Sequence, residues 1–300
     1  MLVIGPAGSG GERGLRVWTA DSDAPQTLPL SGEICFTPLD GRWCTGWRDF
    51  EADVRRKCPD DRRITRGQQC DRCRTEEGFY LCLTCDGTRC PALPPSIERY
   101  CLQTHRLYLA DFGPASRVKV GTASGEEGDS RVVGQAPLAA AYVARGPGPR
   151  VKRLERAASA AGLTQQMTRR RKGATAFDRE TGPSSSDAAA AARERVLATY
   201  AMLRDTLTAD AAAALHTPTF VALPPRHAYA DDVPAAVLPI APGATIRGVV
   251  RHVRGGFALL DVLGMPAILD LGELRGRKLD LTPRDPTPPP AAQLSLFSAS

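Results

Sequence analysis

Cysteines constrain the fold of this 300-residue chain more than any other feature, because eight of its nine cysteines lie between Cys44 and Cys101. Two pairs have the C-x2-C spacing, Cys70 with Cys73 and Cys82 with Cys85. A tight turn of this kind presents two thiolates to one tetrahedral ion, and two such turns complete a four-cysteine site. The sequence therefore predicts a module in which bonds to structural zinc replace much of a hydrophobic core. The expected zinc ligands are Cys44, Cys58, Cys70, Cys73, Cys82, Cys85, Cys90 and Cys101.

A disulfide framework is the alternative use of so many cysteines. The chain shows no apolar N-terminal segment of the signal-peptide type, which favours reduced thiols and an intracellular, cytoplasmic location. Eight thiolates suit one or two zinc ions, but spacing does not show which four belong together. His105, close to the last cysteine of the window, is a further candidate ligand, and Cys35 is left over as an ordinary buried residue.

The net charge of +6 is concentrated in two basic stretches, one within residues 55–66 and one within residues 145–172. Basic stretches of this kind are typical of proteins that bind a phosphate backbone, although each alone is equally typical of a solvated charged face. No run of eighteen apolar residues is present, so we expect no membrane span. DNA is the expected partner, and the residues expected to contact it are Arg150, Lys152, Arg153, Arg169, Arg170 and Arg171.

Apolar periodicity and turn residues predict an α+β chain, in which a cysteine-rich zinc module adjoins a small antiparallel sheet with flanking helices and a C-terminal β-unit. We expect strands over residues 14–18, 107–110, 117–120, 245–251, 256–260, 266–270 and 278–281, and helices over 131–144, 150–161 and 187–215. The expected organisation is an N-terminal segment 1–30, the zinc module 31–104, a domain 105–172, a linker 173–186, a helical segment 187–240, the β-unit 241–282 and a proline-rich tail 283–300.

Several residues of the domain 105–172 match a known pattern: Tyr108 on the first strand, Lys119-Val120-Gly121-Thr122 on the second, then Arg131 and Glu155. The hairpin resembles the GIY-YIG nuclease superfamily, in the version whose second strand reads K-[IV]-G-x-T. More broadly, residues 31–280 resemble an uncharacterised bacterial family that couples a cysteine-rich module to a segment H-x2-YLA-x-FG…KVGT…R…QGA.

The resemblance implies a metal-dependent DNA endonuclease of repair or replication-associated processing. Tyr108 would be the general base, with Lys119 in support, and Arg131 would bind a non-bridging phosphate oxygen. Glu155 would hold one Mg²⁺ or Mn²⁺ ion. The chain departs from the superfamily pattern because Lys119 replaces the second tyrosine and Gln135 lies where some members have histidine. In the bacterial family's segment, Ala136 replaces a glycine.

Two other functions stay open for this domain: a non-catalytic, zinc-containing DNA-binding adaptor, and a domain recruited to small-molecule chemistry. Each candidate residue also has a purely structural interpretation. Tyr108 would then be a half-buried strand residue and Arg131 a surface cation, while Glu155 would balance Lys152 on the same helix face.

The tail ends in Gln293-Leu294-Ser295-Leu296-Phe297, after a proline-rich spacer. This pentapeptide resembles Q-L-[SD]-L-F, the peptide by which bacterial polymerases and repair proteins hold the sliding clamp. Leu294, Leu296 and Phe297 would enter an apolar pocket, and the Gln293 amide would fix the register. The alternatives are a chance match, or a tail that docks on its own domain.

Overall fold

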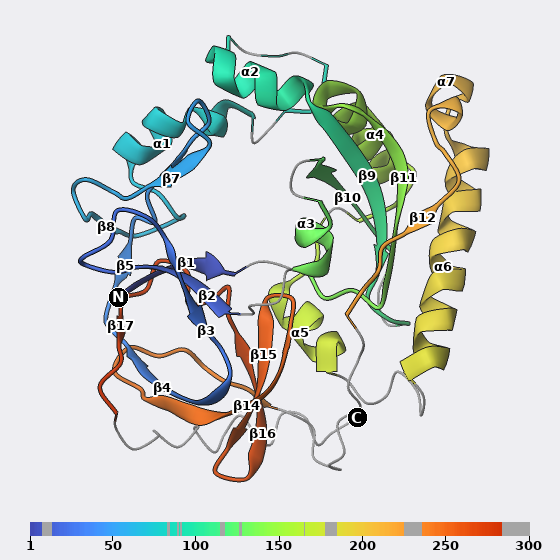
Figure 1. The fold of residues 1–300 in the computed structure, drawn as a ribbon. Coiled ribbons are helices and arrows are strands. Elements are labelled where there is room, and N and C mark those ends of the chain that lie inside the picture. Colours follow the sequence, from blue (N-terminus) through green and yellow to red (C-terminus); the bar gives the residue numbers. More distant parts are fainter. Residues whose placement is uncertain are drawn as a thin grey trace. The chain divides into compact units, whose positions relative to one another are not determined.

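The computed structural model describes residues 1–7, 14–82, 85–88, 90, 92–114, 118–125, 128–164, 166–177, 185–224 and 236–283. These residues form two compact units (Figure 1). The β-rich unit contains residues 1–77 and 236–283, and the mixed unit contains residues 78–224. Helices and antiparallel sheets together confirm the expected α+β class. Within the described part of the chain, no helix is both long enough and apolar enough to cross a membrane.

The described part of the β-rich unit contains a six-stranded sheet in the order β13-β16-β15-β14-β4-β17, a three-stranded sheet β1-β2-β3, two two-stranded sheets, β5-β8 and β6-β7, and one helix, α1. Its elements are β1 (Leu2–Pro6), β2 (Gly14–Trp18), β3 (Gln26–Pro29), β4 (Gly32–Pro38), β5 (Arg42–Trp43), β6 (Trp47–Asp49), β7 (Val54–Arg56), β8 (Arg63–Ile64), α1 (Asp71–Glu77), β13 (Ala236–Val237), β14 (Ile246–Arg254), β15 (Phe257–Val262), β16 (Met265–Asp270) and β17 (Leu279–Asp280).

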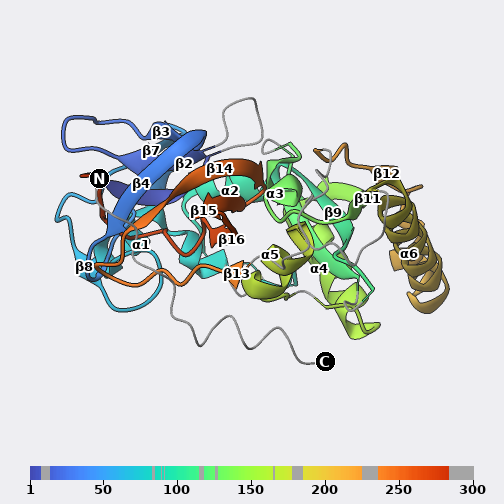
Figure 2. The ribbon, with the colours of Figure 1, turned by 90° about the horizontal axis from the view of Figure 1, so that it is seen from below.

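The six-stranded sheet joins segments from opposite ends of the sequence. Strand β4 pairs antiparallel with β14, with Phe36 opposite Ile246, and it also pairs with β17 (Figure 2). Thr37 and Thr245 share a buried hydrogen bond of 2.9 Å between their hydroxyl oxygens. The four C-terminal strands that the sequence predicts are therefore present, but strand β4 completes their sheet.

The mixed unit contains an antiparallel sheet in the order β10-β9-β11-β12, with helices on both faces. Its elements are the 3-10 helix η1 (Phe79–Cys82), α2 (Pro95–Leu102), β9 (Thr104–Asp111), β10 (Lys119–Ser124), α3 (Ser130–Val133), β11 (Ala139–Pro147), α4 (Gly148–Ala160), α5 (Arg169–Phe177), α6 (Ser185–Thr206), α7 (Ala209–Ala213) and β12 (Thr219–Phe220). The cysteine window of residues 31–104 thus contributes to both units.

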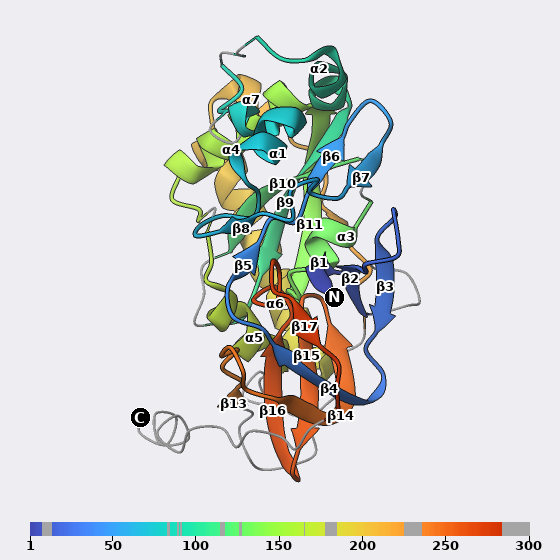
Figure 3. The same cartoon turned by 90° about the vertical axis from the view of Figure 1, so that its left-hand side faces the viewer.

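Strand β9 shows how the sheet of the mixed unit separates two cores, because neighbouring residues point to opposite faces. Leu107 and Leu109 belong to the larger core, which α4 and α6 cover. Tyr108 and Ala110 belong to a smaller core, which includes Val132 of α3. Helices α3 and α4 therefore lie on opposite sides of this sheet (Figure 3).

The helix expected over residues 131–144 is wrong for most of its length. Helix α3 ends at Val133, and the alanine-rich run that follows forms strand β11. Residues 139–144 are buried on both faces of the sheet, between β9 and β12. Alanine favours helices, but small side chains also suit a central strand packed on both sides, and tertiary burial outweighs propensity here.

Candidate metal centre and polar cluster

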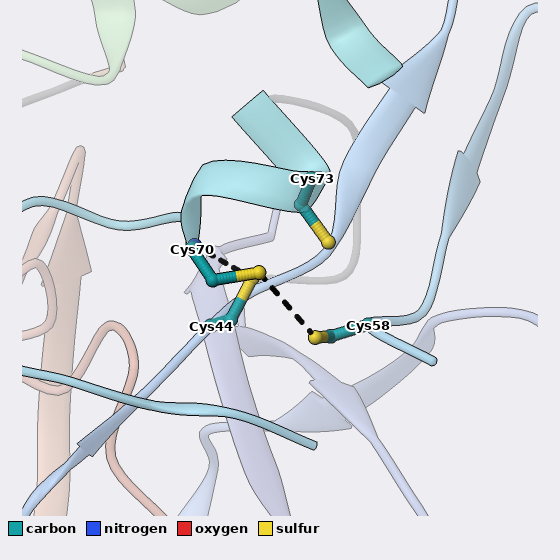
Figure 4. Close-up of side chains that lie close together, drawn as sticks. All are labelled: Cys44, Cys58, Cys70 and Cys73. Atoms are coloured by element: carbon teal, nitrogen blue, oxygen red, sulfur yellow. Dashed lines mark hydrogen bonds between the residues drawn. The ribbon is translucent and has the colours of Figure 1, made fainter. Parts of the chain in front are cut away.

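Four buried cysteines of the β-rich unit meet in one place. The sulfur atoms of the first cysteine group, which is Cys44, Cys58, Cys70 and Cys73, all lie within 4.8 Å of one another. The sulfur atoms of Cys58 and Cys70 are 3.9 Å apart, and the backbone N–H of Cys70 donates to the Cys44 sulfur at 3.2 Å. In Figure 4 the four side chains face a common point. Two sulfur ligands of a tetrahedral zinc ion lie about 3.8 Å apart, so the group fits zinc.

Short elements with few apolar contacts position these thiols. Cys44 lies between β5 and β6, Cys58 follows β7, Cys70 precedes α1 and Cys73 lies in its first turn. Glu77, which ends α1, accepts a hydrogen bond of 2.8 Å from the backbone N–H of Arg48 on β6. Gly46 has φ +78°, and a Cβ there would lie 1.9 Å from the Arg56 carbonyl oxygen, so this turn requires glycine.

Electrostatics also favour a bound cation. Burial raises the pKa of Cys44 to about 11, and hydrogen bonds from the backbone of Cys70 and Gly46 offset only part of that effect. Burial likewise raises the pKa of Cys73, and its neighbours Cys44, Cys58 and Cys70 raise it further. Four thiolates in so small a volume need a cation to balance their charge. A closed four-cysteine set leaves no open position for water, so the zinc would be structural.

The remaining expected ligands lie in the other unit. Cys82, Cys85, Cys90 and Cys101 form the second cysteine group, so the two C-x2-C pairs do not share a site. All nine cysteines are free thiols, so the structure does not contain the disulfide framework considered as the alternative. Among the described residues, only the first cysteine group has ligand atoms within 4.8 Å of one another.

A polar cluster surrounds the Tyr108 hydroxyl on the smaller core's face of the mixed unit's sheet. The Tyr108 oxygen accepts from Lys119 Nζ at 3.0 Å and from Gln135 Nε2 at 2.7 Å. Lys119 Nζ and Lys172 Nζ each donate to Gln135 Oε1, both at 2.8 Å. We call Tyr108, Lys119, Gln135 and Lys172 the Tyr108 cluster. Its two ammonium groups lie within about 6 Å of each other, where like charges repel.

Gly121 explains where the Tyr108 ring lies. The two residues are directly opposite each other on β10 and β9. A Cβ on Gly121 would lie 2.4 Å from the Tyr108 oxygen and 2.5 Å from Cζ, so the ring lies across the glycine. The absence of a side chain at Gly121 therefore lets the phenol reach Lys119 and Gln135.

The other two candidate catalytic residues are placed differently. Arg131 lies on α3 beside the cluster: its carbonyl accepts from Gln135 Nε2 at 3.1 Å, while its side chain is exposed. Glu155 lies on α4, which packs on the opposite face of the sheet from Tyr108. Its carboxylate accepts a hydrogen bond from Lys152 Nζ at 3.2 Å, which matches the alternative in which Glu155 only balances Lys152. The structure thus brings Tyr108 and Lys119 together, but it does not bring Glu155 to them.

A second polar set on the Tyr108 face was missed by sequence reasoning. Tyr142 lies opposite Tyr108 on β11, and its hydroxyl donates to Asp129 Oδ1 at 2.9 Å. Burial raises the pKa of Tyr142 to about 12, with further contributions from its hydrogen bond to Asp129 and from the Asp129 charge. The Arg106 guanidinium lies over the Tyr142 ring, 4.8 Å from its centroid. Because the segment of Tyr142 reads as helical, its register with Tyr108 had no signal in the sequence.

The basic residues expected to bind DNA divide into two sets. Lys152 pairs with Glu155, and Arg153 Nη1 donates to the Gly87 carbonyl at 2.7 Å. Arg150, Arg169 and Arg171 are exposed, while the side chain of Arg170 lies outside the described residues. The clamp-like peptide, with Gln293, Leu294, Leu296 and Phe297, also lies outside the described residues.

No family model, no curated protein and no solved structure matches this chain.

Proposed function

We propose that this chain is a zinc-stabilised, DNA-binding protein whose Tyr108 cluster holds a phosphate of the backbone. The observation that carries the proposal is the convergence of two ammonium groups on Gln135 Oε1. Lys119 is 8% exposed, and among the described residues its Nζ contacts only neutral oxygens and the Tyr108 ring. A phosphate would supply the negative charge that the buried Lys119 ammonium favours, and Lys172 would contact the same phosphate.

The surroundings of the cluster support the same proposal. Three exposed arginines lie on the helices next to the cluster. Arg131 is on α3, just before Gln135, and Arg169 and Arg171 are on α5, which carries Lys172. With this arrangement the cluster would hold one phosphate, while the arginines would contact the neighbouring phosphates of the same DNA strand.

A nuclease is the second candidate function, and a specific observation favours it. The Tyr108 oxygen accepts hydrogen bonds from two donors, Lys119 and Gln135, so a proton taken from water would find an oxygen already oriented by its neighbours. The nuclease interpretation also needs a divalent metal, and the expected ligand Glu155 packs on the other face of the sheet. For this reason we favour the binding function. The clamp-binding role of residues 293–297 remains a proposal.

Fluorescence anisotropy with labelled linear and branched DNA tests the binding function. Replacing both lysines, Lys119→Met and Lys172→Met, should weaken binding and reduce the slope of log K against log salt by about 1–2, because each lost phosphate contact removes about one unit. Arg204→Gln, an exposed residue on α6, is the matched control for loss of charge and should change the slope little. An unchanged slope in the double lysine variant would contradict the proposal.

The same DNA substrates, incubated with Mg²⁺ or Mn²⁺, separate the two candidate functions. The binding function predicts bound but intact DNA. Cleavage that disappears in both Tyr108→Phe and Glu155→Gln would establish the nuclease and overturn the non-catalytic proposal.

A further inference from the structure

We propose that the second cysteine group, Cys82, Cys85, Cys90 and Cys101, binds a second structural zinc ion, so that each unit of the chain has its own. This inference is independent of DNA binding, and its tests measure metal and folding alone.

The turn that carries Cys85 repeats a feature of the first cysteine group. In the first group, the backbone N–H of Gly46 hydrogen-bonds to the sulfur of Cys44, two residues earlier. In the second group, the backbone N–H of Gly87 donates to the Cys85 sulfur at 3.4 Å, again two residues back. The two glycines have similar positive φ angles, +78° and +81°. Both turns are therefore Cys-x-Gly turns that aim an N–H at a sulfur, the arrangement that favours a thiolate ligand.

The start of helix α4 brings the parts of the second group together. A Cβ on Gly87 would lie 2.1 Å from the Pro149 carbonyl oxygen, so the Cys85 turn contacts the first residues of α4. A Cβ on Gly148 would lie 3.2 Å from the Cys101 sulfur, so α2 contacts the same place. Cys82 joins them, because the backbone N–H of Cys85 donates to the Cys82 carbonyl at 3.1 Å.

A hydrogen bond and an ion pair hold the turn on α4. Arg153 donates to the Gly87 carbonyl, and Arg156 pairs with Asp86.

The sulfurs of the second group lie farther apart than those of the first group, because no three of these four described cysteines have ligand atoms within 4.8 Å of one another. Zinc would draw the four thiols together as each gives up its proton.

The need for a metal follows from the poor core of this segment. Among the described residues from 78 to 103, Ile97 is the one buried hydrophobic side chain apart from what the cysteines contribute. Helix α2 and the 3-10 helix η1 therefore have too little apolar burial to stay folded by packing alone. Four bonds to zinc would fasten both to α4.

His105 is an alternative ligand, because a Cβ on Gly148 would lie 3.3 Å from its Cε1, beside the Cys101 sulfur. Its Nδ1 lies 2.9 Å from the Gln103 carbonyl oxygen, which leaves Nε2 available to a metal. We assign the fourth position to Cys90, as a four-cysteine set like that of the first group, and the zinc content of a His105 variant decides between the two residues.

Zinc content per chain tests the assignment, measured by elemental analysis and by native mass spectrometry of the full chain. We expect about two ions in the wild type, and about one in Cys82→Ser/Cys85→Ser and in Cys44→Ser/Cys73→Ser. Cys35→Ser on β4, outside both groups, is the matched control and should keep two ions, as should His105→Asn. One ion in the wild type that persists in Cys82→Ser/Cys85→Ser would overturn the proposal, and loss of an ion in His105→Asn would overturn the choice of Cys90.

A second measurement covers variants that fold poorly. Cobalt titrated into the zinc-stripped wild-type chain should produce thiolate-to-cobalt absorption that saturates near two equivalents, and proteolysis within residues 78–103 should slow as the second equivalent binds. Saturation at one equivalent, with proteolysis of this segment unchanged, would contradict the second site.

Discussion

The substitution Gly121→Ala tests whether the Tyr108 ring depends on the space left by the glycine. The φ angle of Gly121 is outside the left-handed region, so an alanine there would meet no backbone strain. It would meet the phenol instead, with its Cβ 2.4 Å from the Tyr108 oxygen. The ring is 1% exposed, and protein interiors are close-packed, so it must leave its position or push the strand away.

The expected loss of stability has two parts. Forcing a methyl group into a filled core costs about 1–3 kcal/mol. Displacing the phenol also breaks its hydrogen bonds with Lys119 and Gln135, at about 1 kcal/mol each. The free energy of unfolding of the mixed unit should therefore fall by about 3–5 kcal/mol. With a urea m value of about 2 kcal/mol/M, the midpoint should fall by about 2 M.

The distribution of tryptophan and helix makes the assay specific to one unit. All three tryptophans, Trp18, Trp43 and Trp47, lie in the β-rich unit, whereas every described α-helix except α1 lies in the mixed unit. Urea unfolding of the zinc-loaded chain should thus show an earlier transition by far-UV circular dichroism, with the tryptophan transition nearly unchanged. In a Tyr108→Ala background, Gly121→Ala should cost less than about 1 kcal/mol, because the clashing atoms are gone. An equal cost in both backgrounds would refute the steric explanation.

Two further predictions concern charge. Arg195→Leu should destabilise the mixed unit by about 2–3 kcal/mol in the same circular dichroism assay. The Arg195 guanidinium donates to both oxygens of the fully buried Asp111 carboxylate, at 2.8 and 3.0 Å, and the substitution leaves that carboxylate without this partner. Adding Asp111→Asn should restore most of the loss, and no restoration would contradict the ion-pair explanation. The zinc affinity of the first cysteine group should fall by about 100-fold or more for each pH unit of acidification. The pKa values of Cys44 and Cys73 are raised, so both thiols are protonated without metal and each must release a proton when zinc binds. Competition with a chromogenic chelator at two pH values measures this dependence, and equal affinities would contradict it.

Local pattern predicted much of the fold. Alternating apolar residues identified the strands that became β9, β10 and β14 to β16, and helical spacing identified α4 and α6. These elements are each specified within a few turns of chain, so a single sequence contains their signal. Strand β11 failed because its six buried residues are mostly alanine, for which burial between two strands decides the outcome and local propensity misleads.

The candidate sites show the same division between local and distant information. The C-x2-C spacing identified Cys70 and Cys73 as candidate zinc ligands, but it did not predict that Cys44 and Cys58 complete their group, since these two reach Cys70 through loops whose paths are set by other contacts. For the Tyr108 cluster, the hairpin brings Lys119 to Tyr108 as the resemblance implies, whereas Lys172 lies on α5, with three elements between it and the hairpin. Glu155 illustrates the opposite case: a plausible ligand by residue type that the helix α4 turns toward the other side of the sheet.

The pairing of β4 with β14 and β17 sets the order in which the chain can complete itself during synthesis. Residues 78–224 all leave the ribosome before β13, so the mixed unit can fold while five of the six strands of the β-rich unit's largest sheet are still to be made. Until then β4 lacks both of its neighbouring strands, β14 and β17, and Met1 lacks Leu279, with which it forms two backbone hydrogen bonds. A nascent chain of this protein therefore exposes the unpaired backbone hydrogen-bonding groups of β4 during most of its translation.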